Sequence, residues 1–434
     1  MASVFNSLQL PIAQLNLKAV LKCGQSFRWT MVPLDPTKQG SREYKSDTEI
    51  KPGDLPTEEW RLTLEDRVVC LRQTATKLFY RAHFPTESAL SGKDDGTTLP
   101  WLRDYFQLNV NLEALYADWG KRDPVFQKMA PRFVGIRILR QDPWENLMSF
   151  ICSQNNHISR ITSLVHSLCI HFSPPLCSSS ELPGAPLGTS WHPFPPPKAL
   201  ADPNVEAKLR ELGFGYRAKY IQKTAAMLCE KYEDPIKALL ELRQLSTAEA
   251  RKHLLEYHGV GPKVADCILL MSLDKTEVVP VDTHVQQIAT KMYGFRSQGK
   301  QPKAMNPKLY SEIANKFSDT WGSHAGWAHS VLFTADLKSF ANFGLESTAA
   351  ATAHDTVLPL PSPAPIIDKN PLDKQPRAAP TKSKDWFIKR ALRKRKSEQS
   401  TINLKVDEGE TQEASEDTTL AERVKRRRRP GNHA

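Results

Sequence analysis

The chain has 434 residues, enough for two or three domains, and 40% of them are apolar, which is adequate for a packed core. Its formal net charge of +11 suggests an anionic partner and makes nucleic acid the first candidate. The seven cysteines are irregularly spaced and include no CxxC pair, which argues against a disulfide framework and against a zinc site.

The charge is unevenly distributed along the chain. Between Lys374 and Ala434 there are 17 Lys+Arg and 9 Asp+Glu, so this end carries +8 of the net charge and the rest only +3. No run of about 18 apolar residues occurs, so we expect no membrane span. The N-terminus lacks the basic start and continuous apolar core of a secretory signal, and a reduced, intracellular compartment suits the cysteines better.

Residues 25–84 are predicted to form antiparallel β-strands. The segment GQSFRW (24–29) is interpreted as a short aromatic strand, and Trp60, Leu62 and Leu64 alternate with polar residues. A period of two with aromatic and β-branched residues is typical of strands that are buried on one face. Helical spacing of apolar residues follows at 99–120.

Helical patterns dominate after residue 121. Asp142, Pro143 and Glu145 predict a helix start, because an aspartate can cap, a proline suits the first helical position and a glutamate can reach back to the cap. The apolar stripe that follows is interrupted by the polar run 153–157, which predicts a helix, a short turn and a second helix. Three residues of the first helix are assigned to the hydrophobic core: Met148, Phe150 and Ile151.

Residues 173–203 contain nine prolines and are predicted to be a surface insertion or long loop, not a regular element. From residue 346 the composition turns to Ala, Thr and Pro and then to basic clusters, which predicts disorder. The sequence thus predicts an α+β chain. An N-terminal antiparallel sheet domain with helices (1–121) is followed by a helical domain (122–345) and a disordered basic tail (346–434).

The most informative stretch is residues 254–289. A helix is expected to end at His258, Gly259 and Gly261 to make a tight turn, and Pro262 to open the next helix. Backbone N–H groups at such a helix start bind phosphate without reading base sequence. Taken alone, the pattern is equally compatible with a plain helical turn that contains two glycines.

Lys263 lies in the first turn of the second helix of this hairpin, where a positive charge opposes the helix dipole. One interpretation is an exposed surface lysine that tolerates the dipole. The other is an amine whose pKa is lowered by the dipole and by burial. Such a neutral amine is a nucleophile that can form a Schiff base.

Asp282 follows in the run VPVDTH (279–284), at the expected start of another helix. Considered alone, an aspartate there is most simply a helix N-cap. Together with Lys263, this aspartate could serve in a reaction at a sugar. The lysine attacks a sugar C1′, and the carboxylate stabilises the positive charge that develops at that carbon.

Seven motifs occur in one order between about Pro11 and Leu337. They are GQSFRW (24–29), YFQLNV (105–110), RQDPWENLMSFICSQNN (140–156), LGFGYRAKYI (212–221), GVGPKVADCILLM (259–271), VPVDTHV (279–285) and AGWAHSVLFTADL (325–337). Together they resemble the helix-hairpin-helix DNA glycosylase superfamily, and most closely its eukaryotic 8-oxoguanine glycosylase branch. So many long motifs in one order make chance agreement implausible.

The resemblance implies a base-excision repair enzyme that flips 8-oxoguanine, paired with cytosine, out of duplex DNA. Lys263 would displace the base and form the Schiff base that leads to β-elimination at the abasic site, and Asp282 would be the catalytic carboxylate. The resemblance also implies a pocket for the base. Its residues would be Gly24, whose carbonyl meets the N7–H of the oxidised base, Cys267, His329 and Phe333, which stacks on the base.

The resemblance also implies the contacts with DNA. Asn155 would enter the gap that the base leaves, Tyr216 would wedge into the duplex, and Arg160 and Arg217 would contact the orphaned cytosine. The remaining contacts would be to phosphates, from the hairpin glycines Gly259 and Gly261 and from His284. From sequence alone, Cys267 is equally well explained as a small buried core residue.

Two positions depart from the family pattern. His329 stands where the family usually has a glutamine that reads the Watson–Crick edge of the base, and His157 stands where it has an asparagine. A histidine can donate or accept, but not both in the way that an amide does. These changes bear on fine selectivity more than on the reaction class.

No cofactor is expected. Relatives that carry an iron–sulfur cluster need four cysteines after the catalytic segment, and no cysteine follows Cys267 in this chain. The expected partner is double-stranded DNA that contains oxidised guanine, bound by a monomer. Two alternatives remain, namely a related glycosylase for another damaged base and a non-catalytic helix-hairpin-helix DNA-binding module.

The basic clusters at 389–396 and 423–430 lie in the predicted disorder. They predict import into the nucleus, and a mitochondrial pool is a further option. Solvated charge that adds non-specific DNA affinity is the simpler explanation, and the two can hold together.

Overall fold

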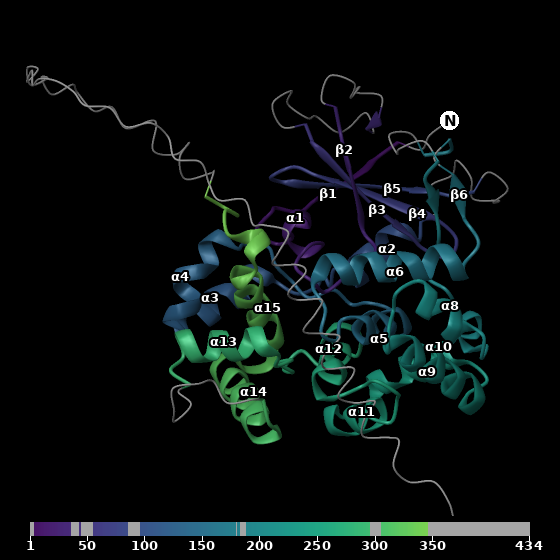
Figure 1. Ribbon diagram of the computed structural model, residues 1–434. Coiled ribbons are helices and arrows are strands. Elements are labelled where there is room, and N and C mark those ends of the chain that lie inside the picture. The colour runs from purple at the N-terminus through teal and green to yellow at the C-terminus, as the bar shows by residue number, and fades with distance from the viewer. Residues whose placement is uncertain are drawn as a thin grey trace, which may run out of the picture. The chain divides into compact units, whose positions relative to one another are not determined.

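The computed structural model describes residues 4–35, 43–44, 55–85, 96–178, 180–182, 188–295 and 305–345 (Figure 1). The expected disorder of 346–434 and both basic clusters lie outside these residues. Within the described part of the chain, an antiparallel sheet is followed by helices, as the sequence predicts. No described helix is both long and apolar enough to cross a membrane.

The sheet has five strands in the order β1-β5-β4-β3-β2, and every neighbouring pair is antiparallel. The strands are β1 (Asn6–Gln9), β2 (Thr30–Pro33), β3 (Glu58–Thr63), β4 (Val68–Gln73) and β5 (Lys77–His83). One face packs Trp60, Leu62 and Leu71 against helix α2 (Thr98–Tyr105). This alternation is the one that the sequence predicts for β3 and β4.

The prediction of strands buried on only one face is wrong. The second face packs Phe79 and Cys70 against Leu182 and Trp191 of the proline-rich segment. That face also holds a buried ion cluster, in which the carboxylate of Glu59 accepts from Arg61 Nε at 2.6 Å and Arg72 Nε at 2.8 Å. Both faces are covered because a segment about 100 residues further along the chain folds back over the sheet.

The interpretation of residues 173–203 as a surface loop without regular elements is therefore also wrong. Strand β6 (Cys177–Ser178) pairs with β7 (Ser190–Trp191), and helix α7 (Pro197–Ala201) follows. The prolines suit this segment because proline at a helix start costs no hydrogen bond, and α7 begins at one.

The segment GQSFRW is not a strand, since β2 begins only at Thr30. Its polar groups are bonded to residues 137–141 in place of a neighbouring strand. Gln25 Nε2 donates to Arg137 O at 3.0 Å, and Gln25 Oε1 accepts from Leu139 N at 3.0 Å. The Arg28 guanidinium donates to Glu145 at 2.6 Å and so attaches the segment to the helical part of the chain.

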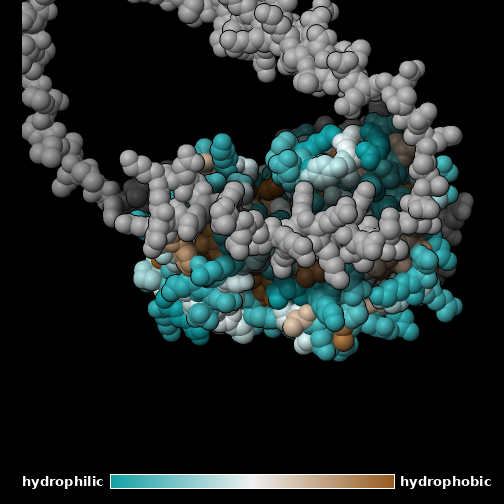
Figure 2. Space-filling view, turned by 60° about the horizontal axis from the view of Figure 1, so that its bottom comes forward, coloured by the Kyte–Doolittle hydropathy of each residue, from teal (hydrophilic) through white to brown (hydrophobic). Residues whose placement is uncertain are grey.

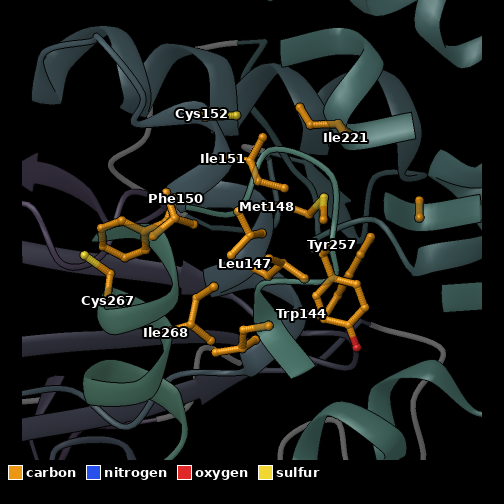
Figure 3. Packing of buried hydrophobic residues seen from close by; sticks show 14 of the residues in the cluster. Trp144, Leu147, Met148, Phe150, Ile151, Cys152, Ile221, Tyr257, Cys267 and Ile268 are labelled. Carbon is orange, nitrogen blue, oxygen red and sulfur yellow. The ribbon is translucent and has the colours of Figure 1, made fainter. Parts of the chain in front are cut away.

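The helices pack around two hydrophobic cores. The first core, part of which is shown in Figure 3, contains side chains from α5 (Pro143–Cys152), α6 (Ile158–Phe172), α8 (Val205–Glu211), α9 (Arg217–Lys231), α10 (Pro235–Glu241), α11 (Thr247–Leu254) and α12 (Pro262–Ser272). The second core is formed by α3 (Leu112–Arg122), α4 (Pro124–Met129), α13 (Thr283–Met292), α14 (Pro307–Trp321) and α15 (Ala325–Asp336). The short helix α1 (Leu17–Val20) packs between the sheet and the second core.

The predicted helix start at Asp142 is confirmed, and so is the helix, turn and helix over 143–172. Asp142 Oδ1 accepts from Glu145 N at 2.8 Å at the N-terminus of α5. Glu145 does not reach back to the cap, because its carboxylate is paired with Arg28. The local signal for the N-cap at Asp142 was correct. The predicted contact from Glu145 back to the cap is replaced by the long-range ion pair with Arg28.

Two glycine-to-alanine changes should have opposite effects on stability. At Gly326 in α15, an added Cβ would lie 2.4 Å from both Leu270 Cδ1 and Val278 O, so Gly326→Ala should lower the free energy of unfolding by about 1–3 kcal/mol. At Gly120 in α3 the nearest atoms would be 3.9 Å away, so Gly120→Ala should raise the same quantity by about 0.5–1 kcal/mol through helix propensity. Urea unfolding of the two variants measures both, and equal effects would contradict the packing described here.

Candidate active site

The helical hairpin that the sequence predicts is present, with one difference in its first helix. Helix α11 ends at Leu254, four residues before the predicted end at His258, and α12 begins at Pro262 as expected. The chain leaves the helix early because Tyr257 and Val260 turn into the first core, where they are 5% and 8% exposed. The turn is closed by Val260 N donating to Tyr257 O.

The two glycines of the turn have different roles. Gly259 has a φ of +78°, and a Cβ on it would lie 2.6 Å from the Tyr220 ring, so the position requires glycine. Gly261 has an extended backbone, and a Cβ on it would meet no atom within 4 Å. The expectation of left-handed backbone is therefore right only for Gly259. The open space at Gly261 instead leaves the start of α12 accessible to a close ligand.

A cavity of about 50 Å³ lies at the junction of the two helical cores and the segment before β2. It is lined by Cys23, Gly24, Gln25, Phe150, Lys263, Cys267, Leu270, Met271, Pro280, Asp282, Val285, His329, Ser330 and Phe333. The structure thus brings together all six residues that the sequence analysis assigned to catalysis and to the base pocket. Their individual roles remain predictions.

Lys263 faces the ring of Phe150, with Nζ 5.0 Å from the ring centroid, a distance at which a cation is attracted to an aromatic face. The expectation of a lowered lysine pKa is not met in this pocket. Burial lowers the pKa of Lys263, but the neighbouring Cys267 side chain and the Asp282 carboxylate raise it by more, and the pKa lies above its usual value. The amine is therefore an ammonium at neutral pH and has to lose a proton before it can attack.

Asp282 is both an N-cap and a pocket residue. Its Oδ1 accepts from His284 N at 2.9 Å and from Val285 N at 3.1 Å, which caps α13. Both capping bonds use Oδ1, and Asp282 also lines the cavity. The interpretation of Asp282 as a helix N-cap is therefore compatible with its interpretation as a catalytic carboxylate.

Cys267 lies one turn after Lys263 on α12, and Figure 3 shows its thiol beside the ring of Phe150. Burial raises the pKa of this thiol to about 11, so it is protonated at neutral pH. Phe150 was assigned only to the core, which is incomplete, because it is 2% exposed and also lines the cavity. The spacing along α5 carries no signal that distinguishes a core wall from a pocket wall.

Phe333 stands between two histidine rings, with centroids 6.0 Å from His284 and 6.1 Å from His329. His284 is half-exposed, and its Nδ1 lies 3.5 Å from Asp336 Oδ2. Gly24 has a φ of +91°, and a Cβ on it would lie 3.0 Å from Ile158 Cδ1 and 3.9 Å from Phe333 Cε1. A flat ring that entered here would lie against Phe333.

His329 is 8% exposed, and neither of its ring nitrogens has a hydrogen-bond partner among the described residues. Burial lowers its pKa to about 4, so the imidazole is neutral at pH 7, with one donor and one acceptor. A buried polar group is rarely left unpaired. The pocket therefore has unmet hydrogen-bonding capacity for a ligand.

The inner part of the pocket is small, at about 50 Å³, and the pocket is partly open to solvent.

Four of the residues predicted to contact DNA gather around the turn between α5 and α6, whereas His284 lies apart from them, beside Phe333. Asn155 is exposed with a φ of +48°, and Arg217 donates to the carbonyls of Gln154 and Asn155. Tyr216 is 46% exposed, its hydroxyl donates to Gln154 O at 3.3 Å, and Arg217 stacks on its ring at 4.6 Å. Arg160 donates to Gly213 O at 3.1 Å and completes the group.

The coloured part of the face in Figure 2 is predominantly hydrophilic, with separate hydrophobic patches. Tyr216 and Leu255 are among the few large hydrophobic side chains that are exposed. His157, the departure noted in the sequence, accepts from Arg160 N at 3.3 Å and thereby caps α6.

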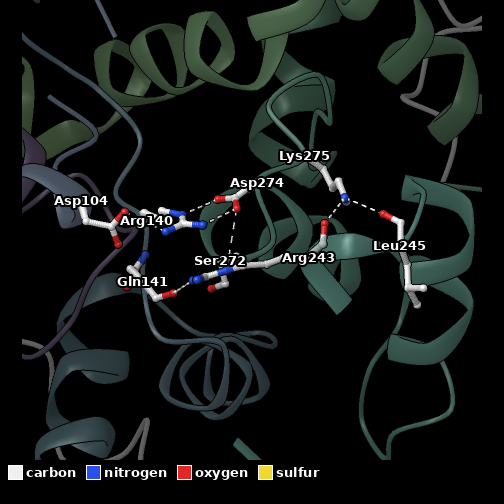
Figure 4. A network of polar contacts seen from close by, with 8 residues as sticks. All are labelled: Asp104, Arg140, Gln141, Arg243, Leu245, Ser272, Asp274 and Lys275. Atoms are coloured by element: carbon white, nitrogen blue, oxygen red, sulfur yellow. Dashed lines mark hydrogen bonds and ion pairs between the residues drawn. The ribbon is translucent and has the colours of Figure 1, made fainter. Parts of the chain in front are cut away.

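The position of α12 is also fixed at its C-terminal end, by the polar network in Figure 4. Arg140 donates to both carboxylate oxygens of Asp274 at 2.7 Å, and Arg243 donates to Ser272 O at 2.7 Å. Lys275 donates to the carbonyls of Arg243 and Leu245. The helix that carries Lys263 is thus held by the glycine turn at one end and by these ion pairs at the other.

Two models of known protein families match the chain. Residues 7–147 match the model of the 8-oxoguanine DNA glycosylase N-terminal domain, and residues 148–314 match that of the HhH-GPD superfamily of base-excision DNA repair proteins. Fold and pocket therefore define a helix-hairpin-helix DNA repair protein.

The curated relatives specify the family. The chain is 36% identical to the N-glycosylase/DNA lyase of Saccharomyces cerevisiae over 78% of its length and 87% of that protein. It is 35% identical to the N-glycosylase/DNA lyase OGG1 of Arabidopsis thaliana over 76% of its length and 80% of that protein. The chain belongs to the 8-oxoguanine DNA glycosylase family of the HhH-GPD superfamily.

Two solved structures are similar in fold over most of the chain. A structure of MBOgg1 with a low-affinity DNA ligand superposes with a TM-score of 0.57 at 27% identity, covering 76% of this chain and 98% of that one. The 8-oxoguanine glycosylase/lyase of Clostridium acetobutylicum, in complex with double-stranded DNA containing cytosine opposite 8-oxoguanine, gives 0.55 at 25% identity, covering 74% and 91%.

The buried histidine makes the fold sensitive to acid. His329 has a pKa of about 4 in the folded protein and about 6.5 when unfolded, so the unfolded state binds the proton first as the pH falls. The contribution of His329 to the free energy of unfolding is fully present above about pH 6.5 and is lost as the pH falls from 6.5 to 4. On acidification from pH 7.0 to 4.5, wild type should lose about 2 kcal/mol more than His329→Gln in urea unfolding. Equal losses would mean that His329 already binds a proton in the folded state.

Proposed function

We propose that this protein is a bifunctional N-glycosylase and abasic-site lyase that removes 8-oxoguanine, paired with cytosine, from duplex DNA. The observation that carries the proposal is the convergence of Lys263 and Asp282, from two different helices, on one pocket. The names of the yeast and Arabidopsis relatives support the two activities. The DNA complex of the Clostridium enzyme supports the lesion and its partner base.

The proposed reaction begins with DNA bound at the hairpin. Backbone N–H groups at the start of α12 hold a phosphate next to Gly261, where no side chain intervenes. The oxidised base leaves the stack and enters the pocket against Phe333. Entry brings the sugar C1′ toward Lys263.

The chemistry then requires a neutral amine. When the Lys263 ammonium has lost its proton, its nitrogen forms a bond to C1′ as the bond from C1′ to the base breaks. The leaving base takes up a proton. The Asp282 carboxylate stabilises the positive charge that develops at the sugar. Opening of the sugar ring gives the Schiff base, and loss of a C2′ proton then expels the 3′ phosphate by β-elimination.

His329 suits the selection of the base. Its neutral ring offers one donor and one acceptor inside the pocket, and both are unpaired in the described residues. Leaving such a group unpaired is costly, so a base that satisfies it is favoured over one that does not.

The lysine mechanism is tested by borohydride trapping on a duplex with 8-oxoguanine opposite cytosine. Wild type should give a covalent protein–DNA band, and Lys263→Gln should give none while it still binds the duplex, because borohydride reduces only a Schiff base. Base release without a band would instead indicate a hydrolytic glycosylase. A binding module would show neither band nor release with wild type.

For the basic clusters at 389–396 and 423–430, we propose a role in import into the nucleus. The supporting observation is the concentration of +8 of the net charge between residues 374 and 434. A chain truncated at about residue 370 should accumulate in nuclei several-fold less than the whole chain while its base-release rate is unchanged. Full accumulation of the truncated chain would assign these clusters to non-specific DNA affinity alone.

A further inference from the structure

A buried carboxylate that the proposed reaction does not use lies close to the pocket. Asp266 is on α12, three residues after Lys263, and is 3% exposed. One of its oxygens accepts from Arg251 Nε at 2.8 Å and the other from the hydroxyl of Tyr310 at 2.6 Å. Both oxygens of Asp266 are thus engaged, and the geometry of Tyr310 is fixed by a short, charge-assisted bond.

Tyr310 makes a second contact, on the far side of its hydroxyl. The oxygen accepts from the backbone N–H of Val281 at 3.3 Å, and Val281 directly precedes Asp282. Val281 is 2% exposed, so no water replaces this bond. One hydroxyl therefore joins the helix of the nucleophile to the backbone that carries the catalytic carboxylate.

The link adds a polar contact to the packing that holds the two catalytic residues. The neighbours of Lys263 on α12, such as Val264 and Ile268, pack in the first core. Val281 and Val285, on either side of Asp282, pack in the second core, which α12 reaches through Leu270. The residues that connect the two helices form no helix or strand, and Lys275 N donates to Leu269 O at 3.1 Å.

We propose that Asp266 and Tyr310 are positioning residues that set the placement of Asp282 relative to Lys263. This inference rests on the proposed function. Its effect is geometric, because Asp266 is not among the groups that shift the pKa of Lys263. A small misplacement of a catalytic group away from its productive position is enough to slow a reaction strongly.

The fold contains a matched control for this pair. The hydroxyl of Tyr293 donates to the buried carboxylate of Asp123 at 2.6 Å, the same length as the bond from Tyr310 to Asp266. Both tyrosines are half-buried and border the second core. Neither Tyr293 nor Asp123 lines the candidate active site. Removal of either hydroxyl should therefore cost similar stability, but only one should affect the reaction.

The experiment compares Tyr310→Phe with Tyr293→Phe in the full chain. Single-turnover base release is measured on a duplex with 8-oxoguanine opposite cytosine, beside duplex affinity, the pH profile of the rate and the urea-unfolding midpoint. Tyr310→Phe should slow base release about tenfold. Duplex affinity should change less than about twofold, and the profile should keep its shape because no charge is removed. Tyr293→Phe should release the base at the wild-type rate.

Two further measurements separate positioning from general damage to the fold. Amide hydrogen exchange of residues 279–283 should be faster in Tyr310→Phe and unchanged in Tyr293→Phe. Asp266→Asn should also slow base release, and the double variant Asp266→Asn with Tyr310→Phe should be no slower than the slower single one, because both changes break one link.

The possible outcomes are distinct. A wild-type rate in Tyr310→Phe, or equal slowing by both tyrosine variants, would overturn the positioning role while the proposed function stands. A tenfold slower base release that is fully explained by a tenfold smaller fraction of folded protein would also overturn the positioning role. Wild type that releases no base would overturn the proposed function, and the inference that rests on it would fall with it.

Discussion

The structure depends on one constraint, which is that an ammonium and a carboxylate must face the same pocket from the N-terminal ends of two different helices. Charges inside a protein are costly unless they are paired, and Lys263 and Asp282 compensate each other there. The pairing contributes to the raised pKa of the amine. It also explains why much of the surrounding structure serves to hold two helix N-termini at a fixed separation.

The fixation is achieved by several independent contacts. The glycine turn and its contact with Tyr220 set the start of α12, and the ion pairs of Arg140 and Arg243 set its end. The cap on α13 orients one oxygen of Asp282, and the same residue lines the cavity.

Much of the fold and the site could be predicted where the signals are local. The starts of α5 and α12 follow from a proline with its preceding residue, and the sheet follows from alternation in β3 and β4. The failures share a cause. Residues 24–29 bond to residues 137–141, the second face of the sheet packs against Leu182 and Trp191, and Glu145 pairs with Arg28, all through contacts between distant segments.

The sequence by itself determined the types of residue available for the chemistry, the hairpin that presents them and the family motifs that suggest their roles, because each is written within a short stretch of chain. Only the tertiary structure decided the direction of the Lys263 pKa, the use of Phe150 as a pocket wall and the unpaired state of His329. Burial and the charge of neighbouring groups set these properties. Both arise only when residues 24, 150, 263, 282 and 329 are brought to one place.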